Sequence, residues 1–243
     1  MKLFIPVICY NHTAHTSFMF SLMSLILSLK HHNIPTVLYP ITFESLISRA
    51  RNAAIAHFMS DPETTHILFI DSDIEFKVED VFALLAANKE VVCAGYAQKW
   101  LNEDIMKSVF ASHIQNPLEL CTRTSIHLLP FDKPAELMRA EYATTGFLLI
   151  KRNVIEKLMT LHPELAYRND IDGYHNANVS YFYNLFPTNI NTTTKRYESE
   201  DYGFSRLWTE AGGEIYVATN VSLKHYGWYG FSANLYRHLQ LMI

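Results

Sequence analysis

The chain has 243 residues, of which 49% are hydrophobic and 18% are charged. This composition excludes an intrinsically disordered protein, which combines low hydrophobicity with high net charge, and the length suits one large domain or two small ones. Twenty Lys and Arg against twenty-four Asp and Glu leave a formal net charge of −4. A dedicated nucleic-acid binder carries a basic excess, so we expect no nucleic-acid partner.

The first 98 residues alternate between apolar runs typical of buried strands and segments with helical spacing. The predicted strands cover residues 3–10, 36–43, 66–70 and 91–96, and the predicted helices cover residues 14–31, 45–59 and 78–88. This alternation predicts an α/β fold with a mostly parallel sheet flanked by helices. Ligands bind beyond the carboxyl ends of strands in such sheets, so we expect residues 10–11, 43–44 and 71–73 to share one edge.

The most apolar segment, residues 18–29, contains three serines and is too short for a bilayer span, which takes about 20 apolar residues. We interpret it as a buried helix. We therefore expect no transmembrane segment and a cytoplasmic protein, with peripheral contact to a membrane left open.

The second half of the chain has a less regular pattern. Residues 100–140 show weak, mixed signals and residues 163–197 are polar and aromatic, which is typical of a long loop. Between and after them we predict strands over residues 145–151 and 214–218, and helices over residues 153–161 and 199–211. No linker or repeat interrupts the chain, so we predict a single domain over residues 1–243.

Two carboxylates, Asp71 and Asp73, are one residue apart directly after the apolar run of residues 66–70. Oxygen ligands of this kind suit Mg²⁺ or Mn²⁺, which also bind substrate phosphates. The alternative is that the pair caps the next helix or is solvated in a turn. The position after a strand of an α/β half favours the metal site.

Two other groups are candidates for chemistry. Arg49 and Arg51 are two residues apart and cannot share a helix face, so one faces solvent while the other can pair with a phosphate or with Asp71. Glu200 and Asp201 begin a helix, where the helix dipole explains them as well as a role as general base does.

The tail holds two further candidates. A neutral imidazole at His225 can complete a metal site built from carboxylates, although the chain has twelve histidines and most are ordinary. Trp228 and Tyr229 can form a surface on which a sugar stacks. The glycine motifs of dinucleotide, P-loop and α/β-hydrolase sites are missing from the sequence.

Five segments carry a family resemblance when taken in order. They are residues 4–11, residues 48–54, the Asp-x-Asp segment 67–74, residues 145–150 and the Glu-Asp segment 199–204. Together they resemble GT-A-type glycosyltransferases, close to the large family-2-like group and most similar to its small single-domain enzymes of bacteria and large DNA viruses. The group's Asp-Asp-x-Ser turn is replaced here by Ile-Thr-Phe-Glu-Ser at residues 41–45.

The resemblance implies a GT-A fold with a nucleotide-sugar-binding half, residues 1–98, and an acceptor-binding half, residues 99–243. It implies a metal-dependent transfer of a sugar from a UDP- or GDP-sugar to a hydroxyl group of a glycan, protein or lipid. Direct attack would invert the anomeric centre, and a retaining transfer, which needs another arrangement, stays open. In this reading Mn²⁺ or Mg²⁺ binds Asp71, Asp73 and His225, and Asp201 with Glu200 is catalytic. The nucleotide sugar would contact Pro6, Val7, Tyr10, Arg49, Arg51, Ser72 and Lys99, and the acceptor would contact Gly146, Trp228 and Tyr229.

Two other functions stay open. A haloacid-dehalogenase-like phosphatase also places Asp-x-Asp after an apolar strand, and Asp71 would then be the nucleophile. That family follows the motif with Gly-Thr or Gly-Val, whereas Ile74 and Glu75 follow here. A non-catalytic module that binds nucleotide sugars is the second alternative, because a fold does not guarantee activity.

Overall fold

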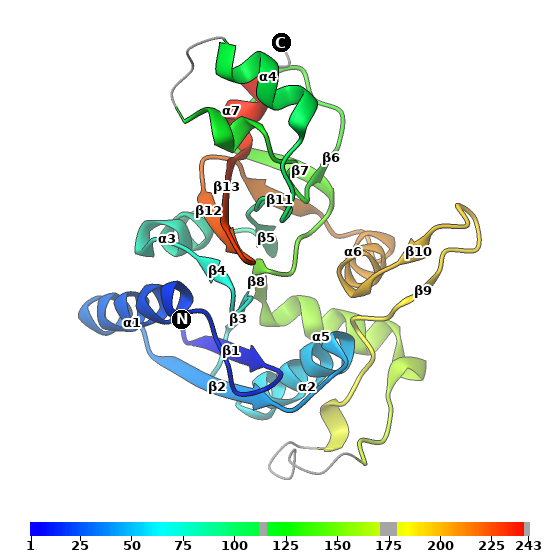
Figure 1. Cartoon of the computed structure of the whole chain (residues 1–243). Coiled ribbons are helices and arrows are strands. Elements are labelled where there is room, and N and C mark those ends of the chain that lie inside the picture. Colours follow the sequence, from blue (N-terminus) through cyan, green and yellow to red (C-terminus); the bar gives the residue numbers. More distant parts are fainter. Residues whose placement is uncertain (112–115, 171–178, 241–243) are drawn as a thin grey trace.

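The computed structural model describes residues 1–111, 116–170 and 179–240, and its centre is an eight-stranded sheet with helices on both faces (Figure 1). In spatial order the strands are β2 (Thr36–Thr42), β1 (Leu3–Cys9), β3 (His66–Ile70), β8 (Phe147–Lys151), β5 (Val91–Cys93), β11 (Ile215–Ala218), β7 (Leu137–Tyr142) and β6 (His127–Leu128).

The sheet is mixed, which corrects the prediction of a mostly parallel one. β1 runs parallel to β2 and β3, and β11 runs parallel to β5. β8, however, lies between β3 and β5 and is antiparallel to both, and β7 is antiparallel to β11 and β6. An apolar run predicts a buried strand but carries no information on its direction or its neighbours, so the insertion of β8 was invisible in the sequence.

Helices α1 (Thr16–His31) and α3 (Val78–Ala87) cover one face of the sheet, and α2 (Ile47–Ser60), α5 (Arg152–Leu161) and α6 (Glu200–Glu210) cover the other. Successive side chains of a strand point to opposite faces. Along β1, Leu3 and Ile5 accordingly pack on the side of α1, while Phe4 packs on the side of α2.

Smaller elements complete the fold. β4 (Ile74–Glu75), β12 (Ser222–Tyr226) and β13 (Gly230–Asn234) form a second sheet, in which β12 pairs with β4 and brings His225 opposite Ile74. β9 (Asn189–Ile190) and β10 (Tyr197–Glu198) form a ribbon, and α4 (Glu103–Ala111) and α7 (Leu235–Gln240) lie near the end of the large sheet (Figure 1). Helices and strands therefore occur within residues 100–140 and 163–197, the two segments whose sequence patterns are weak or typical of a loop. Residues 112–115 and 171–178 lie outside the described residues.

Helix α1 is not fully buried, which corrects the interpretation of residues 18–29. Leu25 and Leu29 face the sheet and are buried, whereas Phe20 and Leu27 on the outer face are 70% and 69% exposed. In the part of the chain that the structure describes, no helix combines the length and the apolar character that a membrane span requires.

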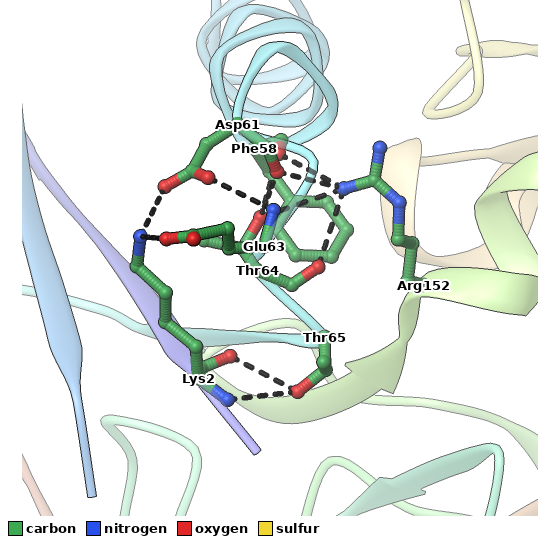
Figure 2. A network of polar contacts seen from close by, with 7 residues as sticks. All are labelled: Lys2, Phe58, Asp61, Glu63, Thr64, Thr65 and Arg152. Carbon is green, nitrogen blue, oxygen red and sulfur yellow. Dashed lines mark hydrogen bonds and ion pairs between the residues drawn. The ribbon is translucent and has the colours of Figure 1, made fainter.

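A polar network holds the amino ends of β1 and β3 (Figure 2). The Lys2 ammonium lies 2.8 Å from Asp61 and 3.1 Å from Glu63. The guanidinium of Arg152, the first residue of α5, donates to backbone carbonyls at and after the end of α2, those of Phe58, Met59, Asp61 and Thr64. A cation at a helix C-terminus satisfies carbonyls that lack intrahelical partners. The network holds the amino ends of these strands in place, and the candidate site lies at their carboxyl ends.

Candidate functional site

A cavity of about 350 Å³ lies at the carboxyl ends of β1 and β3. Its walls come from the ends of these strands, from the segment after β2, from α2 and from the start of α6. The lining residues are Ile8, Tyr10, Glu44, Ser45, Ile47, Arg51, Asp71, Ser72, Asp73, Tyr96, Thr145, Glu200 and Asp201. The segments after the first three strands do meet at one edge, as the sequence predicted.

Arg51 is the buried cation of the cavity, with 2% of its side chain exposed. Its Nη2 lies 3.0 Å from Asp71 Oδ1 and its Nε lies 3.4 Å from Glu200 Oε1, so it connects the end of β3 to the start of α6. Burial by itself lowers the pKa of Arg51, but the charges of Asp71 and Glu200 outweigh it and raise that pKa. Arg49 instead lies 2.6 Å from Glu44, consistent with the different helix faces predicted for the two arginines.

Asp73 has two cationic or potentially cationic neighbours. Its Oδ2 lies 2.5 Å from Lys99 Nζ, and its Oδ1 lies 3.4 Å from His225 Nε2. Burial raises the pKa of Asp73, but the contacts with His225 and Lys99 outweigh burial and lower that pKa to about 2. His225 Nδ1 lies 2.9 Å from the carbonyl oxygen of Ala97. A carbonyl only accepts, so Nδ1 carries a proton and Nε2 is the ring nitrogen that faces Asp73.

Asp73 and His225 are the two side chains that would hold a divalent cation at this site, as two protein ligands. The hydrogen bond at Nδ1 fixes the tautomer that leaves Nε2 as a metal ligand, and carboxylate oxygens suit Mg²⁺ or Mn²⁺. Within residues 1–111, 116–170 and 179–240, no three His, Cys, Asp or Glu side chains form a group that could hold an ion. The predicted trio is therefore not assembled as a metal site, and both of its carboxylates are paired with cations, Asp71 with Arg51 and Asp73 with Lys99. Phosphate and water oxygens would complete the coordination, as is usual for Mg²⁺.

Asp201 lies in the first turn of α6. Its Oδ1 accepts hydrogen bonds from the Ser199 hydroxyl and, at 2.9 Å, from the backbone N–H of Tyr202. Among the described residues, no hydrogen-bond donor contacts its other oxygen, Oδ2. Glu200 differs, since its carboxylate is held by Arg51. Asp201 is thus the carboxylate that is oriented by the protein and still able to take a proton from a ligand.

Other predicted residues lie beside the cavity rather than along it. Pro6 and Val7 lie inside β1, where Pro6 is buried and Val7 packs against the core beneath α1. Gly146 faces the ring of Tyr96, and a Cβ at this position would lie 2.7 Å from the ring. Its carbonyl accepts the backbone N–H of Asp71 at 3.0 Å, so Gly146 positions two residues that do line the cavity.

Trp228 and Tyr229 lie at the turn between β12 and β13. Trp228 is 91% exposed, and Tyr229 lines a separate cavity of about 600 Å³. The neighbouring Gly227 contacts the side chain of Lys99, and a Cβ there would lie 3.3 Å from Lys99 Cδ. This turn therefore adjoins the Lys99 and Asp73 end of the site.

Six lining residues were given no role from the sequence: Ile8, Glu44, Ser45, Ile47, Tyr96 and Thr145. Among them, Glu44 lies two residues after β2 and binds Arg49, Tyr96 lies three residues after β5, and Thr145 lies two residues before β8. Burial raises the pKa of Tyr96 far above its ordinary value, so the phenol is a neutral hydrogen-bonding group in the cavity. The position of Glu44 and Tyr96 after a strand could have identified them in the sequence. Ligands bind beyond the carboxyl ends of strands, and this rule, which singled out Asp71, applies to the other parallel strands as well.

No family model and no curated protein matches the chain. Among solved structures, the chain is similar to A197 from STIV, with a TM-score of 0.49 and 14% identity over 93% of this chain and 86% of A197. It is also similar to HddC from Yersinia pseudotuberculosis, with a TM-score of 0.30 and 10% identity over 64% of this chain and 78% of HddC. Likenesses of this size carry no functional conclusion, so function has to rest on the site itself.

Proposed function

We propose that the protein is a metal-dependent glycosyltransferase of the GT-A type, which transfers a sugar from a UDP- or GDP-sugar to an acceptor hydroxyl. One observation carries the proposal: a single cavity at the carboxyl edge of the sheet brings together Asp73, Arg51 and Asp201. These residues offer a cation site, a fixed positive charge and an oriented base, which are the groups that this reaction needs.

The charge of the cavity supports a cation-assisted reaction on a diphosphate. Its lining contains one arginine and five carboxylates, those of Glu44, Asp71, Asp73, Glu200 and Asp201. A diphosphate would be repelled from these carboxylates unless positive charge accompanied it. A divalent cation bound to Asp73 and His225 would act as a Lewis acid that stabilises the leaving diphosphate. Lys99 adds a flexible ammonium at the same end, and Arg51 supplies a charge that is fixed in place.

Two aromatic residues suit the base of a nucleotide: Tyr10, which lines the cavity, and Phe43, which precedes the lining residue Glu44. Tyr10 and Phe43 are 61% and 71% exposed, and the Phe43 backbone N–H donates to the Tyr10 carbonyl at 2.8 Å. Exposed rings stack on nucleobases without strong preference for one base. The two rings therefore provide a base-binding surface where the family's Asp-Asp-x-Ser turn is missing.

Asp201 has the geometry of the general base. The Ser199 hydroxyl and the Tyr202 N–H hold Oδ1, and Oδ2 accepts the proton of the acceptor hydroxyl. The acceptor oxygen then bonds to the anomeric carbon, while the bond from that carbon to the diphosphate oxygen breaks and its electron pair leaves with the diphosphate. Attack from the side opposite the leaving group inverts the anomeric centre. Glu200 acts by holding Arg51.

Calorimetric titration of UDP- and GDP-sugars, with Mn²⁺ and with a chelator, tests the proposal on wild type, Asp73→Asn and the control Asp104→Asn on exposed α4. We expect one nucleotide sugar to bind only with Mn²⁺, and we expect Asp73→Asn but not Asp104→Asn to abolish this binding. No binding to wild type under any condition would refute the proposal. Detection of a phosphoryl group on Asp71 would then favour the phosphatase, whereas binding without turnover would favour a binding module.

A further inference from the structure

An aromatic cluster lies beside the cavity and outside the hydrophobic core. It consists of Tyr142 at the end of β7, Tyr202 in the first turn of α6 and His127 on the edge strand β6. The two tyrosine rings lie 4.2 Å apart at 46°, and the His127 ring lies 6.0 Å from Tyr142 and 5.9 Å from Tyr202. None of the three belongs to the core clusters found among the described residues. His127 is exposed and the tyrosines are half-buried, so the cluster forms part of the surface.

Arg196, shortly before β10, completes this cluster. Its guanidinium lies 4.2 Å from the centre of the Tyr202 ring and 5.7 Å from that of Tyr142. In the described part of the chain no carboxylate forms an ion pair with it, in contrast to Arg206, which pairs with Glu198 and Glu210. A guanidinium held against aromatic faces keeps its N–H donors in a defined plane. Arg196 thus presents oriented donors to solvent beside two rings.

The cluster is joined to the proposed base by short covalent and hydrogen-bonded links. Tyr202 follows Asp201 in the chain, and its backbone N–H donates to Asp201 Oδ1. At the other tyrosine, the N–H of Ala143 donates to the Ser205 hydroxyl at 2.9 Å, which ties the end of β7 to α6. A molecule bound on these rings therefore lies next to Asp201, on a surface that cannot move independently of it.

The composition of the cluster matches a sugar ring. A pyranose has an apolar C–H face, which packs on aromatic rings, and a rim of hydroxyls, which need both donors and acceptors. Arg196 supplies donors, and Glu141, an exposed residue next to Tyr142 in the chain, supplies carboxylate acceptors. A lipid chain would leave both charges without partners, which disfavours a purely apolar occupant.

We propose that Tyr142, Tyr202, His127 and Arg196 form a carbohydrate-binding site, and that the acceptor of the reaction is therefore a saccharide. The role as acceptor site rests on the proposed function, whereas the binding of a saccharide does not. The site lies on the α6 side of the cavity, away from Trp228 at the β12–β13 turn, which the sequence had favoured for the acceptor.

Saturation-transfer NMR on the full chain tests the site, with methyl glycosides of glucose, galactose, mannose, N-acetylglucosamine and glucuronic acid as probes. Aromatic protein protons are saturated, and transfer to the ring protons of each glycoside is measured in titrations with and without UDP and Mn²⁺. We expect at least one glycoside to receive saturation on one face of its ring. Tyr142→Ala and Arg196→Ala should weaken its binding about tenfold, the loss of one good contact.

Conservative variants and a distant control variant separate a loss of glycoside binding from a loss of folding. Tyr142→Phe retains the ring and should retain binding, while Arg196→Lys should weaken binding about as much as Arg196→Ala does, because an ammonium does not reproduce the planar donor array. Phe20→Ala, an exposed aromatic residue on α1, is the matched control and should leave the glycoside affinity within about twofold of wild type. Thermal unfolding of each variant reports whether the fold is intact.

Two results would overturn the inference: no glycoside binds, or binding survives both Tyr142→Ala and Arg196→Ala. If binding survives both and is lost in Trp228→Ala, the saccharide binds at the β12–β13 turn instead. These outcomes are separate from those for the donor site. Nucleotide-sugar binding without any glycoside binding would overturn the saccharide site alone, and glycoside binding without nucleotide-sugar binding would overturn the proposed function alone.

Discussion

Replacing Arg51 by Met tests the central electrostatic contact of the site. Met has a similar length and is apolar, so the change removes the charge and the hydrogen bonds without leaving a large cavity. Asp71 and Glu200 then lose the guanidinium that lies 3.0 Å and 3.4 Å from them. Since no other cation pairs with these two carboxylates among the described residues, both keep a charge that is partly shielded from water.

The size of the effect follows from burial. Removing one partner of a buried ion pair costs about 3–5 kcal/mol, because the other charge stays behind without compensation. Asp71 and Glu200 keep 31% and 14% of their side-chain exposure, so water still reaches them and the lower end of this range applies. We expect Arg51→Met to lower the free energy of unfolding by about 3 kcal/mol. In a domain of this size that corresponds to a fall in Tm of about 6–12 °C.

Urea and thermal unfolding of Arg51→Met, of the double variant Arg51→Met/Asp71→Asn and of the control Arg139→Met measure the effect. Neutralising Asp71 should recover about half of the lost stability, because it removes one of the two uncompensated charges. Arg139 pairs with Glu214 on the surface, with both side chains about half exposed, so its loss should cost less than about 1 kcal/mol. A cost for Arg51→Met no greater than that of the control, or no recovery in the double variant, would refute this account of the site.

Three further predictions concern the base, a close backbone contact and a buried imidazole. Asp201→Asn should keep nucleotide-sugar affinity within about twofold while transfer falls about 10²–10⁴-fold, measured as nucleoside diphosphate release with a saccharide acceptor; unchanged turnover would exclude Asp201 as the base. Gly203→Ala should lower the free energy of unfolding, measured in urea, by about 3 kcal/mol, because the new Cβ would lie 2.0 Å from the Pro187 carbonyl oxygen. A decrease below about 1 kcal/mol would contradict this packing. Burial lowers the pKa of His57 from 6.5 to about 4, so the unfolded chain takes up a proton before the folded one does, and stability should fall by up to about 3 kcal/mol as pH drops from 6.5 to 4. His57→Phe should flatten this dependence, and identical pH profiles for the variant and wild type would contradict the prediction.

The secondary structure of the first half could be predicted closely because its signals are local. The predicted strand over residues 66–70 coincides with β3, and the predicted helices deviate by two residues or fewer at each end from α1, α2 and α3. Period, turn residues and strand-forming side chains act within a few residues of the chain. The same pattern predicted that residues 10–11, 43–44 and 71–73 lie together, because strands that alternate with helices place their carboxyl ends on the same side of a sheet.

The placement of β8 shows what such signals omit. Its first four residues are apolar and buried, so nothing in their pattern distinguishes a parallel strand at the edge of the sheet from an antiparallel strand at its centre. The same holds for the tail, where β12 and β13 are short and the pairing of β12 with β4 sets the position of His225. The position and direction of such strands depend on which apolar surfaces are still exposed after the other elements have packed.

For the candidate site, the sequence by itself determined three features. Asp71 and Asp73 follow a strand, Arg49 and Arg51 lie on different faces of α2, and α6 begins with two acidic residues. Each of these features depends only on the spacing of residues along one element. Only the tertiary structure decided that Arg51 binds Asp71 and Glu200, that Asp73 faces Lys99 and His225, and that Tyr142 and Tyr202 meet beside Asp201. Arg51 and Glu200 are 149 residues apart in the chain. Contacts over such separations form only when the whole sheet closes, and they depend on the order and direction of strands that no local pattern encodes.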